Sequence, residues 1–300
     1  MGIYQRELET GFKAIPMILM NYFSISLIFM LIGYQERKKF SYLLLLLMLV
    51  QVAILFFLGD RSGAILPFIA FLWVWHKVIS PIPFKLLLPA SLIILFILFP
   101  LISYTRILSG VYRLDLNFLY TAFMSIENPI ISIISEMGAS LTTLSYTMQL
   151  VPEVKDYEFG TSYFYAAYSI IPNFFSDIHP AKAHGSPSDW ITISTFPHYY
   201  FRGGGLGYSF IAESYLNFGW ALGIAILGLQ GYLIGKLDIF SKYSTKPQNI
   251  AFTASLMIFL LKYTRADMFS VFRPLVWYVF IPFSLIFIFM FLKRVNKIKN

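Results

Sequence analysis

Long runs of apolar residues, separated by short polar stretches, dominate this chain. A helix needs roughly 17 to 25 mainly apolar residues to cross the ~30 Å hydrocarbon core of a bilayer. On this criterion the sequence predicts about seven membrane spans. These are residues 14–34, 41–58, 64–79, 86–104, 210–235, 250–264 and 275–292. The pattern therefore predicts an all-α fold, a polytopic transmembrane helix bundle.

The spans divide the chain into three parts. Residues 1–104 contain the first four spans, and residues 210–300 contain the last three with a basic tail. Residues 105–209 form the connection between them, which is far longer than an ordinary loop. Prolines at 152, 172, 180, 187 and 197 divide the later part of this connection into short pieces.

The earlier part of the long connection shows helical periodicity. Asn128 and Pro129 form a helix-start signal, and apolar residues then recur at helical spacing up to Met148. The opposite face is rich in Ser and Thr, with Glu136 beside it. We therefore expect an amphipathic helix, broken in two at Gly138 or continuous, that lies along the membrane surface or dips partly into it.

The composition excludes a soluble protein. Apolar residues make up 58% of the chain and charged residues 13%, against roughly 25% charged residues in an ordinary soluble domain. Cysteine is absent, which excludes disulfides, thiolate metal sites and a cysteine nucleophile. The net charge of +8 fits cytoplasmic basic residues and anionic lipid, so no nucleic-acid partner is predicted.

Charge also predicts the orientation of the bundle. The C-terminal tail is basic between Lys293 and Lys299, which places it in the cytoplasm. Alternation of the spans then places the long connection outside, where most of the arginines also fall. The outer arginines are Arg6, Arg61, Arg106, Arg113, Arg202, Arg265 and Arg273. Arginine holds phosphate or carboxylate with a rigid two-pronged fork, so this distribution indicates an anionic ligand. Contact with lipid headgroups, or pairing with nearby acids, is the alternative for each one.

Several of these arginines follow directly on a span or precede one. Arg61 follows Asp60 in a short outer turn, and Arg106 comes after the fourth span. Arg265 and Arg273 lie between the last two spans, where a helix ending at Pro274 would place both on one face. With Arg202, four separate regions deliver an arginine to the outer mouth of the bundle.

The start of the fifth predicted span carries an unusual polar stripe. Ser209, Glu213 and Asn217 are spaced four apart, so they share one helix face. A carboxylate inside a span is a functional candidate, while pairing with an arginine such as Arg202 or Arg265 is the alternative. Glycines at 219, 223, 231 and 235 lie on one face of the same span and predict close helix packing.

A glycine-rich run precedes this span. Residues 202–207 read Arg-Gly-Gly-Gly-Leu-Gly, and Gly205 and Gly207 lie just before the helix begins. Exposed backbone N–H groups beside a helix start favour an anion. Among metal candidates, Asp177, His179, His184 and Asp189 match no standard ligand spacing. The sequence also has no P-loop, zinc-protease or serine-hydrolase motif, so neither a metal site nor another cofactor is predicted.

Five stretches resemble the O-antigen polysaccharide polymerase (Wzy) family. They are "FLGDRSG" at 57–63, "SEMGASLTTLSYTMQLVPE" at 135–153, "YSIIPN" at 168–173, "GGGLGYSFIAESYLNFG" at 203–219 and "RADMFSVFRP" at 265–274. The resemblance implies many helices, one large periplasmic segment and an arginine-rich periplasmic site in the inner membrane. This sequence differs from the family in the number of spans, because such polymerases usually have ten or more and about seven are predicted here. We therefore expect that the first spans are missing from this reading frame or that its start is internal.

The resemblance also implies an activity. Members of the family transfer a growing glycan from undecaprenyl pyrophosphate to a new lipid-linked repeat, so the implied ligands are a lipid-linked donor and acceptor, and the implied partners are a chain-length regulator and a flippase. Arginines would stabilise the departing pyrophosphate, and a base would take the proton of the acceptor hydroxyl. Glu213 ranks first as that base, His198 second and Asp267 third. The residues expected to bind substrate are Arg61, Arg106, Arg202, Arg265, Arg273, Gly205, Gly207 and Glu136.

Two alternative functions remain open from the sequence. An O-antigen ligase-like enzyme would use the same donor but a different acceptor. A flippase or exporter of lipid-linked sugars would not be an enzyme, and it would carry polar residues through the whole bilayer depth with inverted repeats. The cytoplasmic halves of the predicted spans are almost purely apolar, and no internal repeat is evident. The pattern therefore favours an enzyme whose site lies on the outer side.

Overall fold

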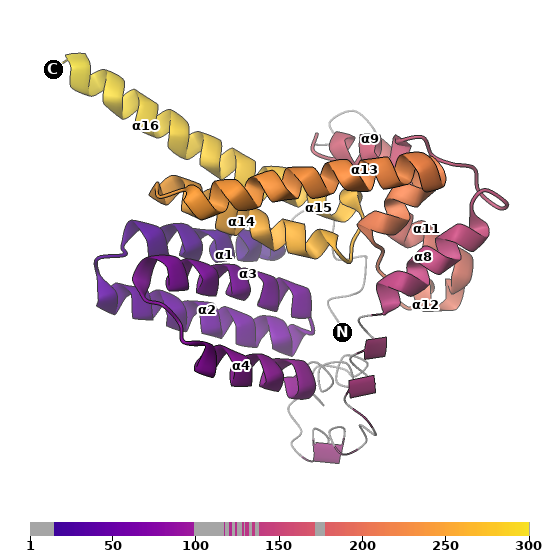
Figure 1. Ribbon diagram of the computed structural model, residues 1–300, viewed down its shortest axis with the longest axis horizontal. Helices are drawn as coiled ribbons and strands as arrows, with labels where there is room; N and C mark the ends of the chain where they lie inside the picture. Colours follow the sequence, from indigo (N-terminus) through magenta and orange to yellow (C-terminus); the bar gives the residue numbers. More distant parts are fainter. Residues whose placement is uncertain are drawn as a thin grey trace.

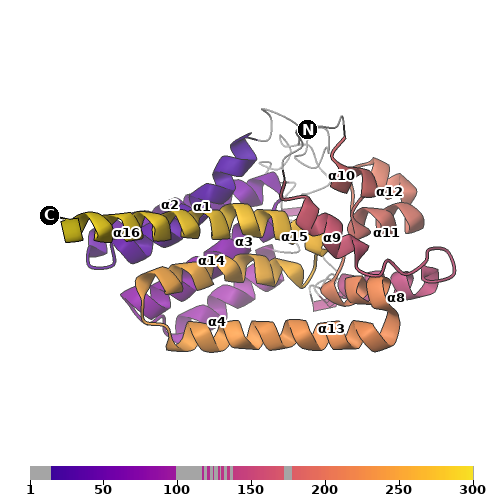
Figure 2. The same cartoon turned by 90° about the horizontal axis from the view of Figure 1, so that it is seen from above.

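The computed structural model describes residues 15–98, 138–171 and 178–299, together with single positions between 117 and 135. Over these residues the chain forms helices and no strand, which confirms the predicted all-α class. Long helices run side by side in a bundle, and a group of short helices covers one end of it (Figures 1 and 2). We refer to the short helices as the cap.

Within the described residues, each predicted span overlaps with one helix of the bundle or with consecutive helical elements. The elements are α1 (Ile15–Gly33), α2 (Lys38–Leu58), α3 (Arg61–Val74) with the π-helical turn η3 (Trp75–Ile79), α4 (Phe84–Ile93) with η4 (Ile94–Leu98), α13 (Phe210–Tyr243), α14 (Pro247–Tyr263), and α15 (Met268–Leu275) with η6 (Val276–Phe280) and α16 (Ile281–Lys299). Within the part of the chain that the structure describes, four helical stretches are long and apolar enough to cross a membrane: Lys38–Leu58, Arg61–Ile79, Phe210–Tyr243 and Met268–Leu292. The helical stretches Ile18–Gly33 and Phe84–Ile97 are apolar but shorter.

Helix α14 lies at the centre of the bundle. It packs against α1 and α3, and its small residues Ala251 and Ala254 are buried in the contact. The facing side of α3 contributes Ala70 and Phe71, both fully buried. Small side chains let helices approach closely in a membrane, where packing drives association. Helix α14, which corresponds to the sixth predicted span, is therefore a buried partner of its neighbours.

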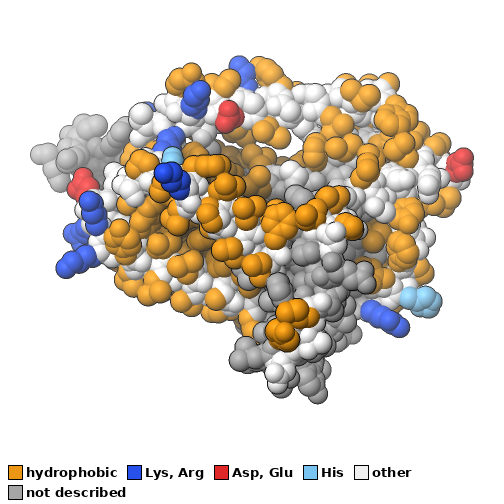
Figure 3. Space-filling model, turned by 60° about the horizontal axis from the view of Figure 1, so that its bottom comes forward, with side chains coloured by type: hydrophobic (Ala, Val, Ile, Leu, Met, Phe, Trp, Pro, Cys, Tyr) orange, Lys and Arg blue, Asp and Glu red, His pale blue; other side chains and the backbone are white. Residues whose placement is uncertain are grey.

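The two ends of the bundle carry different elements. At one end Lys77, after α3, donates to the carbonyl of Ser241 near the end of α13. The turn that holds Arg37 lies at this same end (Figure 1), and most Lys and Arg side chains visible in Figure 3 gather along one edge, beside a wide hydrophobic face. The cap covers the opposite end, where α3 begins at Arg61 and α14 ends before Arg265. This arrangement agrees with the predicted alternation of the spans.

The fifth predicted span is wrong as one continuous helix. Gly219 has φ +64° and ψ −157°, a conformation that belongs almost only to glycine, and the chain turns sharply there (Figures 1 and 2). Residues 210–218, which we call the elbow, therefore point away from the long part of α13. Gly223 brings the long part against the backbone of Ser214, since a Cβ there would lie 3.1 Å from the Ser214 oxygen.

The predicted role of the glycine face is correspondingly wrong. Among described atoms, nothing lies within 4 Å of the position that a Cβ would take at Gly231 or Gly235. Within the described part of the chain, these two glycines therefore make no close helix contact. Gly219 and Gly223 instead form the break, which the spacing of four could not distinguish from a packing stripe.

The cap contains five described helices, and several begin at the predicted prolines. They are α8 (Ala139–Leu150), α9 (Thr161–Tyr168), α10 (Pro180–His184), α11 (Pro187–Thr195) and α12 (Pro197–Phe201). Proline suits the first helical position because its missing N–H has no partner there in any case. The side chains of His179 and Ser186 cap α10 and α11 by accepting backbone N–H groups.

Helix α8 packs its hydroxyl face inward against the protein, and its location at the membrane surface stays a prediction. Thr143 and Thr147 are buried, whereas Leu141 is 69% exposed. The Thr147 hydroxyl donates to the Thr143 carbonyl, so it accepts the proton of the Tyr208 hydroxyl at 3.0 Å. Burial raises the pKa of Tyr208 well above its ordinary value, so this phenol stays protonated and donates. The hydroxyls of α8 thus stabilise the join between α8 and α13.

The segment between the last two spans also differs from its prediction. Arg265 lies in the turn between α14 and α15, and α15 begins only at Met268, so Arg265 and Arg273 do not share a helix face. Pro274 does not end the helix, because α15 passes directly into η6 and α16. Proline removes one N–H and crowds the preceding turn, and the wide π-helical turn after it lets the helix continue.

Replacing Gly219 by alanine should destabilise the protein by about 1–3 kcal/mol, because its conformation strains any residue with a Cβ. The ring of Tyr157 adds a steric conflict at 3.2 Å from the new atom. Gly231→Ala is the matched control, since it lies in open space and should stabilise its helix by roughly 0.5–1 kcal/mol. Thermal unfolding of both purified variants in detergent measures the difference. Equal melting temperatures for wild type and Gly219→Ala would contradict the break.

Single cysteines should report the orientation of the bundle, because the chain has no native cysteine. Ser62→Cys and Thr245→Cys are both exposed, and they lie at opposite ends. We expect an impermeant thiol reagent to label position 62 in intact cells whose outer membrane has been made permeable. Position 245 should react only after the inner membrane is opened. The reverse pattern would invert the proposed orientation.

Candidate functional site

Three separate segments meet where the cap joins the bundle. The elbow of α13, helix α9 and the N-terminus of α15 pack together there, and each contributes a buried polar side chain. Glu213 and Asn217 come from the elbow, Ser162 from α9, and Asp267 precedes α15. Glu213, Asn217 and Asp267 are 0% exposed, and Ser162 is 1% exposed. We call these four residues the acid cluster.

Glu213 uses both of its carboxylate oxygens. The Ser162 hydroxyl donates to Oε1 at 3.0 Å, and the backbone N–H of Met268 donates to Oε2 at 2.7 Å. Both carboxyl oxygens thus have a hydrogen-bond partner, which offsets part of the cost of burying this polar group. The alternative pairing with an arginine does not fit this geometry, because the side chains of Arg202 and Arg265 are exposed.

Asn217 holds α9 against the elbow. Its amide NH₂ donates to the Ser162 hydroxyl at 2.7 Å and to the Glu213 carbonyl at 2.8 Å. Its amide oxygen accepts the N–H of Gly160 at 2.8 Å, directly before α9 begins. The Asn217 side chain therefore bonds both Ser162, which donates to Glu213, and the start of α9, the helix that carries Ser162.

Asp267 binds the N-terminus of α15, the helix start to which Glu213 also bonds. Its Oδ1 accepts the N–H of Ser270 at 2.8 Å, which makes it the N-cap of α15. Its Oδ2 accepts the N–H of Ser188 in α11 at 3.0 Å. The partial positive charge of a helix N-terminus favours nearby carboxylates, so two acids can be buried side by side at α15.

Hydroxyl groups surround the acid cluster. Tyr163 of α9 shares a hydrogen bond with Ser214 at 3.2 Å, and Gln230 donates to Tyr263 at 3.4 Å. Burial, and secondarily the negative charge of Glu213, raise the pKa of Tyr163 to about 12. The Tyr163 phenol therefore stays neutral at physiological pH.

The predicted substrate-binding arginines lie outside this buried cluster. Arg202, Arg265 and Arg273 are exposed, and Arg61 is half-buried at the start of α3. Arg202 follows the C-terminal end of α12, and Arg273 lies in the last turn of α15. Arg61 and Arg265 both lie at the capped end of the bundle. Arg106 and Glu136 lie outside the described residues.

The glycine-rich run connects α12 to the elbow and passes close to Arg265. A Cβ at Gly207, which has φ +74°, would lie 3.4 Å from the Arg265 carbonyl oxygen. Within the run, the N–H groups of Gly203 and Gly204 donate to the end of α12, and that of Leu206 donates to Thr192 at 3.2 Å. Part of the backbone expected to bind an anion is thus bonded within the protein, which leaves Gly205 and Gly207 as the candidates.

The remaining sequence candidates have varied surroundings. His198 is exposed on α12, four residues before Arg202 in the sequence. His179 caps α10, and His184 stacks on Tyr165 with ring centres 4.2 Å apart. Asp177, a candidate metal ligand from the sequence, lies outside the described residues. Asp189 lies in the first turn of α11.

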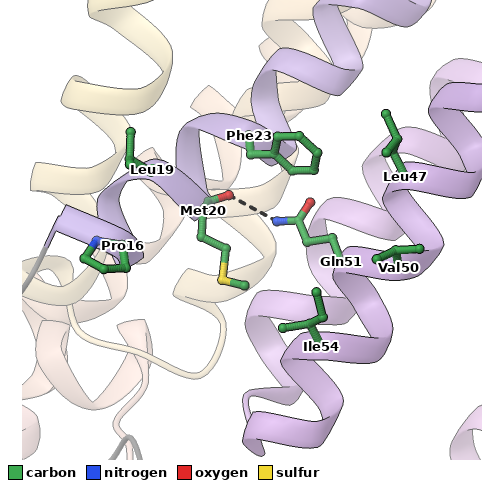
Figure 4. Close-up of a pocket in the computed structure, with 8 residues that line it drawn as sticks. All are labelled: Pro16, Leu19, Met20, Phe23, Leu47, Val50, Gln51 and Ile54. Atoms are coloured by element: carbon green, nitrogen blue, oxygen red, sulfur yellow. Dashed lines mark hydrogen bonds between the residues drawn. The ribbon is translucent and has the colours of Figure 1, made fainter.

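A separate apolar groove of about 360 Å³ lies between α1 and α2 (Figure 4). Its lining residues are Pro16, Leu19, Met20, Phe23, Leu47, Val50, Gln51 and Ile54. Gln51 donates to the Met20 carbonyl at 3.1 Å and to Ser24. These bonds join the two helices, and the groove contains none of the acid cluster.

Sequence reasoning found Glu213, Asn217 and Asp267 but missed Ser162 and the Met268 N–H. The four-residue spacing on the elbow identified the first two. Ser162 is one of many serines, and only the packing of α9 shows that it bonds Glu213. A backbone N–H carries no signal in the amino-acid sequence at all.

Comparison with known proteins agrees with this architecture. The sequence matches the family described as O-antigen polysaccharide polymerase Wzy over residues 4–299, nearly the whole chain. No curated protein and no solved structure matches it. The match covers the predicted spans, the cap and every candidate site residue. The chain therefore belongs to the O-antigen polysaccharide polymerase Wzy family.

Proposed function

We propose that this chain joins lipid-linked oligosaccharide repeats at the outer face of the inner membrane, with arginines holding the pyrophosphate of the donor. The family acts as a polymerase on lipid-linked repeat units, and the apolar helices fit a multi-pass inner-membrane protein. The observation that carries the finer proposal is the set of arginines at the capped end. Arg61 and Arg265 lie there on separate elements, and Gly207 adjoins Arg265.

The proposed reaction is a glycosyl transfer. A hydroxyl of the acceptor repeat attacks the anomeric carbon of the growing glycan, and the bond from that carbon to the pyrophosphate oxygen breaks. Negative charge then builds up on the departing undecaprenyl pyrophosphate, and the hydroxyl proton passes to a base. Arginine forks placed at the leaving group stabilise this charge more in the transition state than in the ground state.

Among the three candidate bases, we propose His198. Glu213 and Asp267 are fully buried, and each of their four carboxylate oxygens already accepts a hydrogen bond. A base must reach the proton that it takes, within about 2.6–3.2 Å or through one water. His198 is exposed and lies near Arg202 along the chain, so a substrate held by Arg202 could meet it.

The proposed partners are the lipid-linked donor and acceptor. Arg106 and Glu136 belong to the same substrate-binding proposal, with no geometry available from the described residues. A chain-length regulator and a flippase are the protein partners that the family implies. The C-terminus is proposed to face the cytoplasm, as the basic tail predicts.

Lysine in place of Arg265 or Arg273 should greatly reduce polymer, because lysine keeps the charge but loses the planar fork. A charge-assisted bond contributes roughly 1.5–3 kcal/mol, so we expect about a ten- to hundredfold loss of rate. Arg37→Lys is the matched control at the opposite end, where Arg37 lies over the ring of Tyr34. Surface polysaccharide ladders, compared at equal protein levels, give the measurement. Wild-type ladders from both lysine variants would contradict the pyrophosphate clamp.

Deleting the gene should distinguish polymerase from the alternative functions. A cell without the polymerase should still attach one repeat unit to its surface lipid. A cell without the flippase or the ligase should attach none. We expect a gel of surface lipid to show a single repeat in the deletion strain, and a ladder after the intact chain is returned. A deletion strain with no attached repeat would favour one of the alternatives.

A further inference from the structure

The N-terminus of α15 is held by two acids from different parts of the chain. Asp267 caps the helix by accepting the Ser270 N–H, and Glu213 accepts the Met268 N–H from the elbow. The first N–H groups of any helix have no partner inside the helix. Here one of them is satisfied by a residue far away in sequence, so the position of α15 depends on Glu213.

The burial and hydrogen bonds of Glu213 differ from those of a catalytic group that is accessible to substrate. Its side chain is 0% exposed, and its two donors come from the protein itself. Asn217 in turn fixes Ser162, the second donor. Among the described residues, the Glu213 carboxyl hydrogen-bonds to an α9 hydroxyl and to an α15 backbone N–H, so it is placed to fix these two segments.

The segment fixed by Glu213 carries two of the proposed substrate-binding arginines. Arg265 lies three residues before Met268, and Arg273 lies in the last turn of α15. The Arg265 carbonyl also contacts the glycine-rich run at Gly207. A displaced α15 start would therefore move Arg265 relative to Gly207, while the rest of the bundle kept its packing.

We propose that Glu213 is a positioning residue, which holds the start of α15 and thereby places Arg265 for the substrate. Asn217 and Ser162 support it by fixing the carboxylate. The proposal rests on the proposed function of Arg265. It assigns no proton transfer to Glu213, so glutamine and alanine at this position should behave differently.

Glu213→Gln should retain function, whereas Glu213→Ala should lose it. The glutamine amide oxygen can accept the Met268 N–H and keep the bond to α15, and its NH₂ can donate to Ser162, whose hydroxyl then accepts at this bond where it had donated. Alanine leaves both donors buried without a partner, which predicts at least about a tenfold loss of polymer. We expect the glutamine variant to stay within about threefold of wild type, as an amide keeps the geometry without the charge. A base could not be replaced by glutamine.

The position of α15 can be measured without any activity. Spin labels on Ala167→Cys in α9 and Thr264→Cys before α15 both lie at exposed positions. Their distance distribution, measured by pulsed electron paramagnetic resonance, should be narrow and alike in wild type and Glu213→Gln. It should broaden or shift in Glu213→Ala. Glu158→Ala is the matched control, because Glu158 is a nearby buried acid that pairs with Lys155 and not with α15.

The two measurements separate the possible failures. Loss of polymer in Glu213→Gln with an unchanged distance would overturn positioning and favour a direct chemical role. An unchanged distance in Glu213→Ala would overturn it as well, whatever the polymer yield. If the wild-type chain restores no ladder to a deletion strain, the proposed function fails, and the distances still decide whether Glu213 positions α15.

Discussion

The hydrogen bond from the Met268 N–H to the Glu213 carboxylate is the interaction on which the capped end depends. It joins the elbow of α13 to the start of α15, and Ser162 brings α9 to the same carboxylate. Burying a carboxyl group is costly unless its oxygens are hydrogen-bonded. The cost also makes the arrangement specific, because few alternative packings would supply donors at both oxygens.

The break at Gly219 makes this bond possible. A continuous α13 would carry Glu213 and Asn217 along the axis of a membrane span, where unpaired polar groups are expensive. The positive φ of Gly219 turns residues 210–218 into the cap, where α9 and α15 provide partners. The polar stripe of the elbow thus packs against α9 and α15, whereas the long part of α13 beyond Gly219 is apolar and largely exposed on the bundle.

Charges of opposite sign have separate roles at this end of the molecule. The acids Glu213 and Asp267 are buried and bind backbone N–H groups. The arginines 202, 265 and 273 are exposed, and Arg61 is half-buried. Because the buried acids bond to N–H groups of the protein, they fix the backbone from which Arg265 and Arg273 extend. This separation suits a site for an anionic, lipid-linked ligand that arrives from the membrane surface.

The sequence by itself determined the helical membrane class, the family and the approximate positions of the apolar helices, since length and apolarity of each run are local properties. It also identified Glu213 and Asn217, because helical spacing places them on one face. Only the tertiary structure decided that Gly219 breaks the helix, that α8 turns its hydroxyls inward, and that Ser162 and the Met268 N–H bind Glu213. A glycine every four residues permits either a packing face or a break, and a hydroxyl can satisfy its bonding in lipid-facing, aqueous or buried positions. Contacts between segments far apart in the chain choose between these outcomes.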